Sequence, residues 1–124
     1  MNDNYLDEFG KLLMSFVRDQ VVHQLEGEIN QKIKNDISKK ISVIVNDQKI
    51  DCNQKITQLV PFAVDYTLHY FLWLLEDTNR FQLIYKSEDG TSVELNSISD
   101  GLSGEIFGED GWISRFSTER KVNY

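Results

Sequence analysis

The 124-residue sequence has few of the residues from which common active sites are built. It contains two histidines and one cysteine, Cys52, so a disulfide within the chain is excluded. It has one proline, Pro61, and no Pro- or Ser-rich stretch that would mark a linker. We therefore expect a single domain over residues 1–124. The scarcity of histidine and cysteine leaves few routes to nucleophilic or transition-metal catalysis, and we expect neither a catalytic residue nor a cofactor.

Long apolar runs are also missing. The longest wholly apolar run is Phe71–Leu75, whereas a helix that crosses a bilayer needs about 20 apolar residues. Residues 1–4 lack the basic and apolar regions of a secretory signal. The sequence therefore predicts a protein without a membrane partner. A cytoplasmic location is expected and suits a lone cysteine, because that compartment keeps thiols reduced.

Positive charge is scarce in the second half of the chain. Residues 1–55 carry eight Lys/Arg against nine Asp/Glu, and residues 56–124 carry five against eleven, so most of the net charge of −7 lies in the second half. Such a surface repels phosphate groups, which argues against a nucleic-acid partner and favours a basic protein partner. The alternative interpretation is that moderate acidity only keeps the protein soluble.

The first half of the chain shows helical periodicity. Apolar residues at three- and four-residue steps predict a helix over residues 4–25, with Gly27 near its end. Isoleucines at four-residue steps predict a second helix from residue 29 to residue 41. Residues 41–45 are rich in β-branched side chains, so they suit either helix or a short strand.

Two further helices are expected in the middle of the chain. The first should start near Asn46 or Asp47 and stop before Pro61, because proline favours the first turn of a helix. The next should cover residues 62–77. Since it is apolar around most of its circumference, we expect it to be the central core helix. Its buried side chains should include Phe71, Leu74 and Leu75.

Beyond residue 80 the apolar period changes from that of a helix to that of a strand. Alternating runs on either side of Asp89-Gly90 predict an antiparallel hairpin. Residues 98–106 suggest a short helix, and residues 112–117 a candidate third strand. The expected fold class is α+β: a helical N-terminal two-thirds packed on a small antiparallel C-terminal sheet.

Asp65, His69 and Glu76 are the most suggestive polar set. On a helix they fall within one narrow stripe. An Asp and a His one turn apart could ligate a metal or form an acid–base pair, although the spacing matches no known metal motif. We favour a simpler interpretation, a polar stripe with an Asp–His hydrogen bond and no metal.

The segment from residue 100 to residue 112 is rich in glycine and carboxylates. It lacks the alternating ligands of a calcium loop, and Gly101-Leu102-Ser103-Gly104 is one residue short of a nucleophile elbow. Turns and a helix stop explain it most simply. The alternative is a partner-binding loop in which carboxylates surround aromatic anchors. Its candidate residues are Glu105, Phe107, Glu109, Asp110 and Trp112.

Three stretches of the sequence resemble segments of small uncharacterised bacterial proteins. They are Pro61–Leu72, Ser99–Glu105 and Glu109–Trp112. In size and acidity, proteins of this kind resemble the immunity proteins that protect bacteria from toxins of neighbouring cells. The resemblance implies a binding role and adds no catalytic residue.

Three hypotheses about function follow. The first is a non-catalytic bacterial interaction protein of the immunity type, which binds and neutralises a toxin or effector domain. The second is a small carboxylate- and histidine-dependent enzyme or metal-binding module that uses Asp65, His69 and Glu76. The third is an intracellular regulatory or structural domain, with a homodimer through the first helix as one arrangement.

Overall fold

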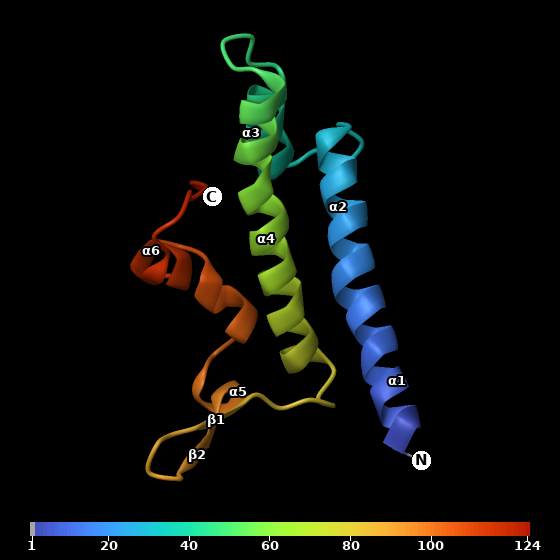
Figure 1. Ribbon diagram of the computed structural model, residues 1–124, viewed down its shortest axis with the longest axis vertical. Coiled ribbons are helices and arrows are strands. Elements are labelled where there is room, and N and C mark those ends of the chain that lie inside the picture. The colour runs from blue at the N-terminus through green and yellow to red at the C-terminus, as the bar shows by residue number, and fades with distance from the viewer. Residues whose placement is uncertain (1) are drawn as a thin grey trace.

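The computed structural model describes residues 2–124, and its N-terminal third is one long helical rod. Helix α1 (Asn2–Leu13), the π-helical turn η1 (Met14–Arg18) and helix α2 (Asp19–Ile29) follow one another without a break (Figure 1). Val17 and Val21 are buried, and the Phe16 ring lies 5.6 Å from the ring of Trp73. The rod therefore packs through η1 and α2 against the later helix that carries Trp73.

Gly27 lies inside α2, and the helix continues for two residues beyond it. The amides of Lys32 and Ile33 both donate to the Gly27 carbonyl oxygen, at 2.8 and 2.9 Å, as the chain turns back. A Cβ at position 27 would collide with the Ile33 side chain. Glycine is thus needed here for the close approach of the turn.

Helix α3 (Asp36–Val45) starts at a reciprocal capping box. The Asn35 side chain accepts from the Ser38 amide and the Ser38 hydroxyl accepts from the Asn35 amide, both at 2.8 Å. The helix runs through residues 41–45, for which the sequence left helix and strand open. Ile41 is fully buried, so tertiary packing outweighs the β-branched composition of this segment.

Helix α4 (Cys52–Asp77) corrects our expectation of two helices divided at Pro61. A second capping box, formed by Asp51 and Gln54, starts the helix, which then continues through the proline. An internal proline removes one backbone hydrogen bond and costs about 3 kcal/mol. Pro61 and Phe62 are both buried, and we attribute the continuity to this packing.

The prediction that residues 62–77 form a core helix agrees with the burial of α4. Leu74 is fully buried and Leu75 is buried, while Phe71 is only half-buried. Leu72 and Leu75 meet Leu102 and Ile106 of the C-terminal segment in one apolar cluster. One part of the core therefore lies between α4 and this segment, and another part lies between α4 and the rod.

The C-terminal segment contains a hairpin of strands β1 (Ile84–Lys86) and β2 (Ser92–Glu94), with Tyr85 paired to Val93. It continues through helix α5 (Leu95–Ile98) and the 3-10 helix η2 (Leu102–Ile106). The short helix expected over residues 98–106 is therefore split into two pieces. Helix α6 (Trp112–Phe116) replaces the expected third strand, which was wrong.

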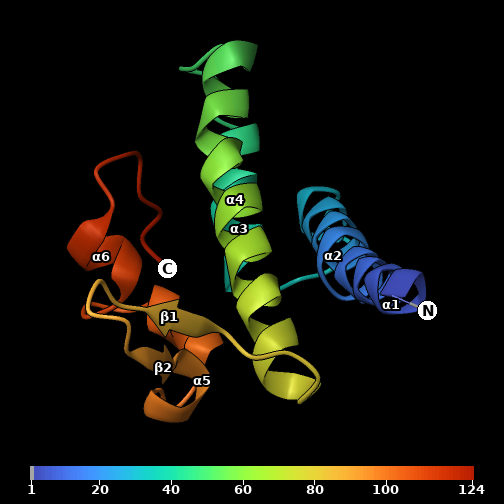
Figure 2. The same cartoon turned by 60° about the horizontal axis from the view of Figure 1, so that its bottom comes forward.

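The α+β fold class is confirmed, with a two-stranded sheet near the C-terminus. Both strands are largely exposed, and η2 makes the main contact with α4. Figures 1 and 2 show α4 standing between the α1–α2 rod and the C-terminal segment. Among the described residues, none of the helices combines the length and apolarity that a membrane crossing requires.

Candidate functional site

The polar stripe of α4, made of Asp65, His69 and Glu76, faces the C-terminal segment. The Ser103 amide donates to Glu76 Oε1 at 2.8 Å, and His69 Nδ1 lies 3.1 Å from the Ser103 carbonyl oxygen. A carbonyl oxygen can only accept, so His69 Nδ1 is the donor in this contact. Two side chains of the stripe therefore hold both backbone groups of Ser103 in η2.

Asp65 does not form the hydrogen bond to His69 that we expected. It accepts instead from the Tyr124 hydroxyl, with 2.6 Å between the two oxygens. The Tyr124 ring packs edge-on against Phe62 and Phe107, with centroids 6.0 and 5.0 Å apart. The stripe thus fixes the C-terminal segment to α4 at two points, Ser103 and Tyr124.

Burial governs the protonation of this pair. It raises the pKa of the Asp65 carboxyl above the ordinary value of 3.8, and the hydrogen bond from Tyr124 only partly offsets the rise. Burial, together with the hydrogen bond to Asp65 and its charge, also raises the pKa of the Tyr124 phenol. Tyr124 therefore keeps its proton and remains the donor.

The three residues of the polar stripe do not converge on one point. Eleven positions separate Asp65 from Glu76 along α4, which corresponds to about 16 Å at the rise of an α-helix. Within residues 2–124, the structure places no group of three or more His, Cys, Asp or Glu side chains so that they could hold a metal ion. The residues bind the protein's own backbone and tail.

Residues of η2 and of the turns on either side of it line a shallow, open depression of about 610 Å³, here called the acidic hollow. Its lining consists of carboxylates, glycines and one aromatic ring, and contains no lysine or arginine. It brings together four of the five residues predicted for partner binding and adds Asp100. The lining residues are Asp100, Gly101, Gly104, Glu105, Phe107, Gly108, Glu109, Asp110 and Gly111.

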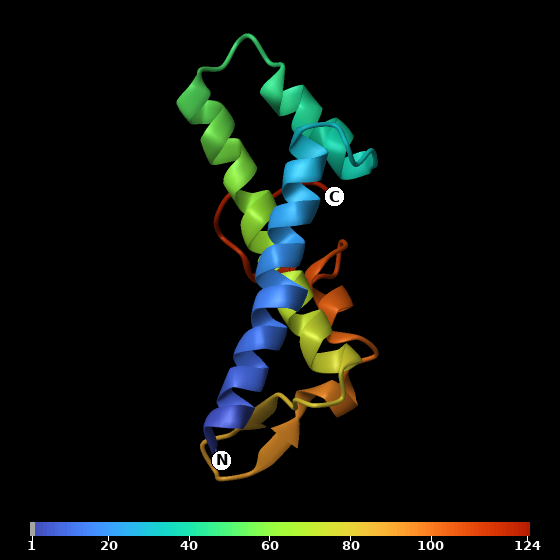
Figure 3. The ribbon, with the colours of Figure 1, turned by 90° about the vertical axis from the view of Figure 1, so that its right-hand side faces the viewer.

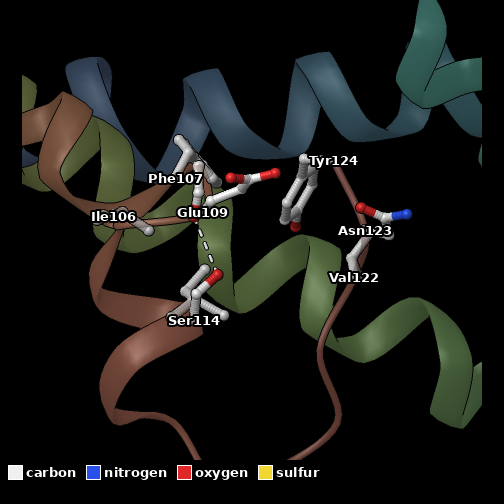
Figure 4. Close-up of a pocket in the computed structure, with 9 residues that line it drawn as sticks. Ile106, Phe107, Glu109, Ser114, Val122, Asn123 and Tyr124 are labelled. Atoms are coloured by element: carbon white, nitrogen blue, oxygen red, sulfur yellow. Dashed lines mark hydrogen bonds between the residues drawn. The ribbon is translucent and has the colours of Figure 1, made fainter.

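A second, smaller pocket adjoins the acidic hollow. It has a volume of about 300 Å³ and lies between the η2–α6 segment and residues 122–124 (Figure 4). Phe107, Gly108 and Glu109 line both depressions. The Ser114 hydroxyl donates to the carbonyl oxygen of Gly108, which lines both depressions, at 2.9 Å.

Within residues 2–124, no carboxylate of the acidic hollow forms an ion pair. The ion pairs that the structure describes lie elsewhere, at Arg18–Asp19, Lys39–Asp36 and Arg80–Glu8. The nearby cations have other contacts: Arg115 lies over the Phe116 ring, and Lys121 Nζ donates to the Ser114 carbonyl oxygen. Glu105 accepts from the neutral Ser99 hydroxyl at 2.9 Å. No direct ion pair among the described residues therefore neutralises the carboxylates of the hollow.

Local backbone requirements shape the hollow. Gly108 has a φ of +94°, a conformation that glycine adopts at little cost. A Cβ at the buried Gly111 would collide with the Phe107 carbonyl oxygen. Trp112 is half-buried and packs against the apolar cluster of Leu72, Leu75, Leu102 and Ile106. Trp112 therefore packs on the core and is not among the residues that line the acidic hollow.

Glu28 is a buried polar residue that our sequence reasoning missed. It is fully buried, and its carboxylate accepts from Gln24 Nε2 at 2.5 Å, from Asn35 Nδ2 at 3.2 Å and from the Tyr66 hydroxyl at 2.8 Å. These donors come from α2, from the cap of α3 and from α4. Glu28 thus joins three helices, and nothing in its sequence neighbourhood distinguishes it from an exposed glutamate.

No protein-family model matches this chain, and comparisons with curated proteins and with solved structures find no similar sequence or fold.

Proposed function

We propose that this chain is a non-catalytic interaction protein that receives basic side chains of a protein partner in the acidic hollow. The observation that carries the proposal is the lining itself. Four carboxylates surround one depression without a lysine or arginine among the lining residues. A guanidinium or ammonium group that enters the hollow would find charge-assisted hydrogen-bond acceptors on several sides.

The hollow is held in shape before any partner arrives. His69 and Glu76 hold Ser103, while Leu102 and Ile106 are buried in the core beneath it. A rigid site loses little conformational entropy on binding, so more of the interaction energy contributes to affinity. The negative charge of its carboxylates would also speed the encounter with a basic partner.

Within this class we propose an immunity-type protein of the bacterial cytoplasm, which binds a toxin or effector domain. Such a protein works by covering a cleft of its partner and needs no reactive group of its own. The proposal agrees with the engagement of Asp65, His69 and Glu76 in internal contacts. It also agrees with the net charge of −7, because toxins that act on nucleic acid present basic clefts.

The test uses the protein encoded beside this chain's gene. We expect that protein to arrest growth of a bacterial host when expressed alone and to be neutralised when this chain is expressed with it. Reversing Glu109 and Asp110 to Lys should lower the association rate constant at low salt by about tenfold or more, and rising salt should erase the difference. Surface-based kinetics across a salt series measures both effects.

A matched control shows whether the association rate depends on where the charges are reversed or only on the net charge of the protein. Glu88→Lys with Glu119→Lys makes the same change of charge at exposed sites outside the hollow. We expect this variant to associate nearly as fast as the unchanged protein. The proposal is wrong if the neighbouring protein is harmless and does not bind. It is also wrong if both double reversals slow association equally.

A further inference from the structure

Residues 117–124, here called the strap, run from α6 back to α4 without forming a helix or a strand. Figures 1 and 3 show the end of the strap beside α4, away from the β1–β2 hairpin. Within the described residues, positions 118–124 make no backbone–backbone hydrogen bond, and all of the strap except Ser117 and Val122 is exposed. A segment with so few buried contacts opens more easily than the core.

One side chain fastens the strap to α4. The Tyr124 hydroxyl donates to Asp65, and the Tyr124 ring packs against Phe62 and Phe107 although 38% of the residue is exposed. The other polar contact of the strap is the 3.3 Å hydrogen bond from Lys121 Nζ to a carbonyl oxygen of α6. Docking of the strap therefore depends mainly on the buried carboxyl of Asp65.

The strap also brings positive charge close to the acidic hollow. Residues 87–114 contain no lysine or arginine, whereas the strap carries Arg120 and Lys121 directly after Glu119. While the strap is docked, neither basic residue lines the hollow, and neither forms an ion pair among the described residues. Lys121 is held instead on Ser114, whose hydroxyl bonds to the lining of the hollow at Gly108.

A strap released from α4 can reach the hollow. The Ser117 amide bonds to the Ile113 carbonyl oxygen, so the strap stays attached to the end of α6. The seven positions from Asp110 to Ser117 are mostly helical and span about 10 Å. From Ser117, three extended residues cover up to about 10 Å before the side chain of Arg120 adds its own length.

We infer that the hydrogen bond between Tyr124 and Asp65 regulates the acidic hollow by keeping the basic pair of the strap, Arg120 and Lys121, out of it. The inference rests on the proposed function of the hollow as a receptor for basic groups. A released strap places this pair among the carboxylates as a competitor within the same chain. A short tether gives such a competitor an effective concentration in the millimolar range.

Asp65 acts in this scheme as a positioning residue, because it is not among the residues that line the hollow. A strap that only fastens the fold would need Tyr124 and Asp65, but it would not need positive charge at positions 120 and 121. The two roles therefore differ in one measurable respect. Only in regulation does the effect of losing Asp65 depend on Arg120 and Lys121.

Carbodiimide cross-linking tests where the strap lies, because this reagent joins a lysine amine to a carboxylate that touches it. We expect few cross-links between Lys121 and the hollow in the unchanged protein and several-fold more in Asp65→Ala. Mass spectrometry of the digested protein locates them. Asp65→Asn is the matched control, since it removes the same carboxyl but its amide oxygen still accepts from Tyr124. No increase in Asp65→Ala would overturn the inference.

Calorimetry with an acetylated tetra-arginine amide tests the effect on the hollow. The probe should bind Asp65→Ala at least about threefold more weakly than the unchanged protein, because the tethered competitor is present at millimolar effective concentration. Asp65→Asn should bind it like the unchanged protein. Adding Arg120→Gln with Lys121→Gln to Asp65→Ala should restore binding. The same two glutamines should have a smaller effect in the unchanged protein, as in a double-mutant cycle of coupled sites.

The outcomes separate this inference from the proposed function. Circular dichroism of each variant checks that the helices are intact. Weak binding to Asp65→Ala that the two glutamines do not relieve would overturn the inference, because Asp65 would then act only on the fold. The proposed function fails instead if the unchanged protein does not bind the probe, or if Glu109→Lys with Asp110→Lys binds it equally well. Cross-linking still shows in that case whether the strap reaches the hollow.

Discussion

The pair formed by Asp65 and Tyr124 shows how one residue can be stabilising through its hydrogen bond and costly through its charge. The Asp65 carboxylate is largely buried, yet its partner is a neutral hydroxyl. Its raised pKa means that the folded state favours the protonated form. The stabilisation from protonation is complete below the ordinary pKa of 3.8 and is lost as pH rises through the raised value.

Asp65→Asn should therefore be tolerated at neutral pH. The amide oxygen can still accept from the Tyr124 hydroxyl, and the charge that burial disfavours is gone. We expect unfolding at neutral pH to need at least as much denaturant as for the unchanged protein, with a weaker dependence on pH above 3.8. Asp65→Ala should cost about 1–3 kcal/mol, because it leaves the Tyr124 hydroxyl unpaired. Equal losses in both variants at every pH would contradict this account.

Gly111 is a second residue with a specific requirement. Gly111→Ala would drive its Cβ into the Phe107 carbonyl oxygen, which is backbone and cannot move aside cheaply. We expect a loss of about 1–3 kcal/mol in the free energy of unfolding, the range for overpacking. Gly104→Ala is the matched control, because its Cβ would meet no atom within 4 Å. Denaturant unfolding of the two variants gives the comparison, and similar losses would show that the collision is relieved elsewhere.

At this scale the sequence showed which residues were unusual but could not show what they bind. Asp65, His69 and Glu76 were found because helical spacing is a local property. Their partners, Ser103 and Tyr124, are 27 to 59 positions away and depend on tertiary docking. The carboxylates of the acidic hollow were easier to predict, since they cluster within eleven consecutive residues.

Among the elements, α4 shows the limit of reading helix boundaries from single residues. The apolar periodicity is helical on both sides of Pro61, and only the proline itself suggested a boundary. The helix continues through Pro61, and we attribute this to the burial of Pro61 and Phe62. The false third strand at residues 112–117 has a different cause. Six residues are too few to separate a period of 2 from one of 3.6, and no neighbouring strand is present in the described residues to pair with them.

The central position of α4 predicts a large effect of shortening its most buried side chain. Leu74 is fully buried, so Leu74→Ala should cost about 2–5 kcal/mol through lost contacts and a residual cavity. Leu6→Ala is the matched control, since Leu6 is 71% exposed and should change stability by less than about 0.5 kcal/mol. Thermal unfolding at neutral pH measures both. Equal effects would mean that α4 is not the centre of the core.

For the whole molecule, α4 divides the surface into sides with different chemistry. The α1–α2 rod covers one side and the C-terminal segment with its acidic hollow covers another. A third side carries four exposed apolar residues, Ile56, Val60, Val64 and Leu68. Composition alone showed that the acidity is concentrated in the second half of the chain. The separation of that acidity from the exposed apolar residues of α4 required the structure.

The hydrogen bond between Asp65 and Tyr124 also has a consequence in time. Its two residues are 59 positions apart, so α4 leaves the ribosome well before Tyr124 has been added. The contacts between the rod and α4 need no residue beyond α4, so they can form before the C-terminal segment docks. Throughout that interval the polar stripe of α4 faces solvent. Until the C-terminal segment docks, these polar residues make this surface of α4 less apolar than Leu72 and Leu75 alone would make it, which should reduce aggregation of the partly folded chain.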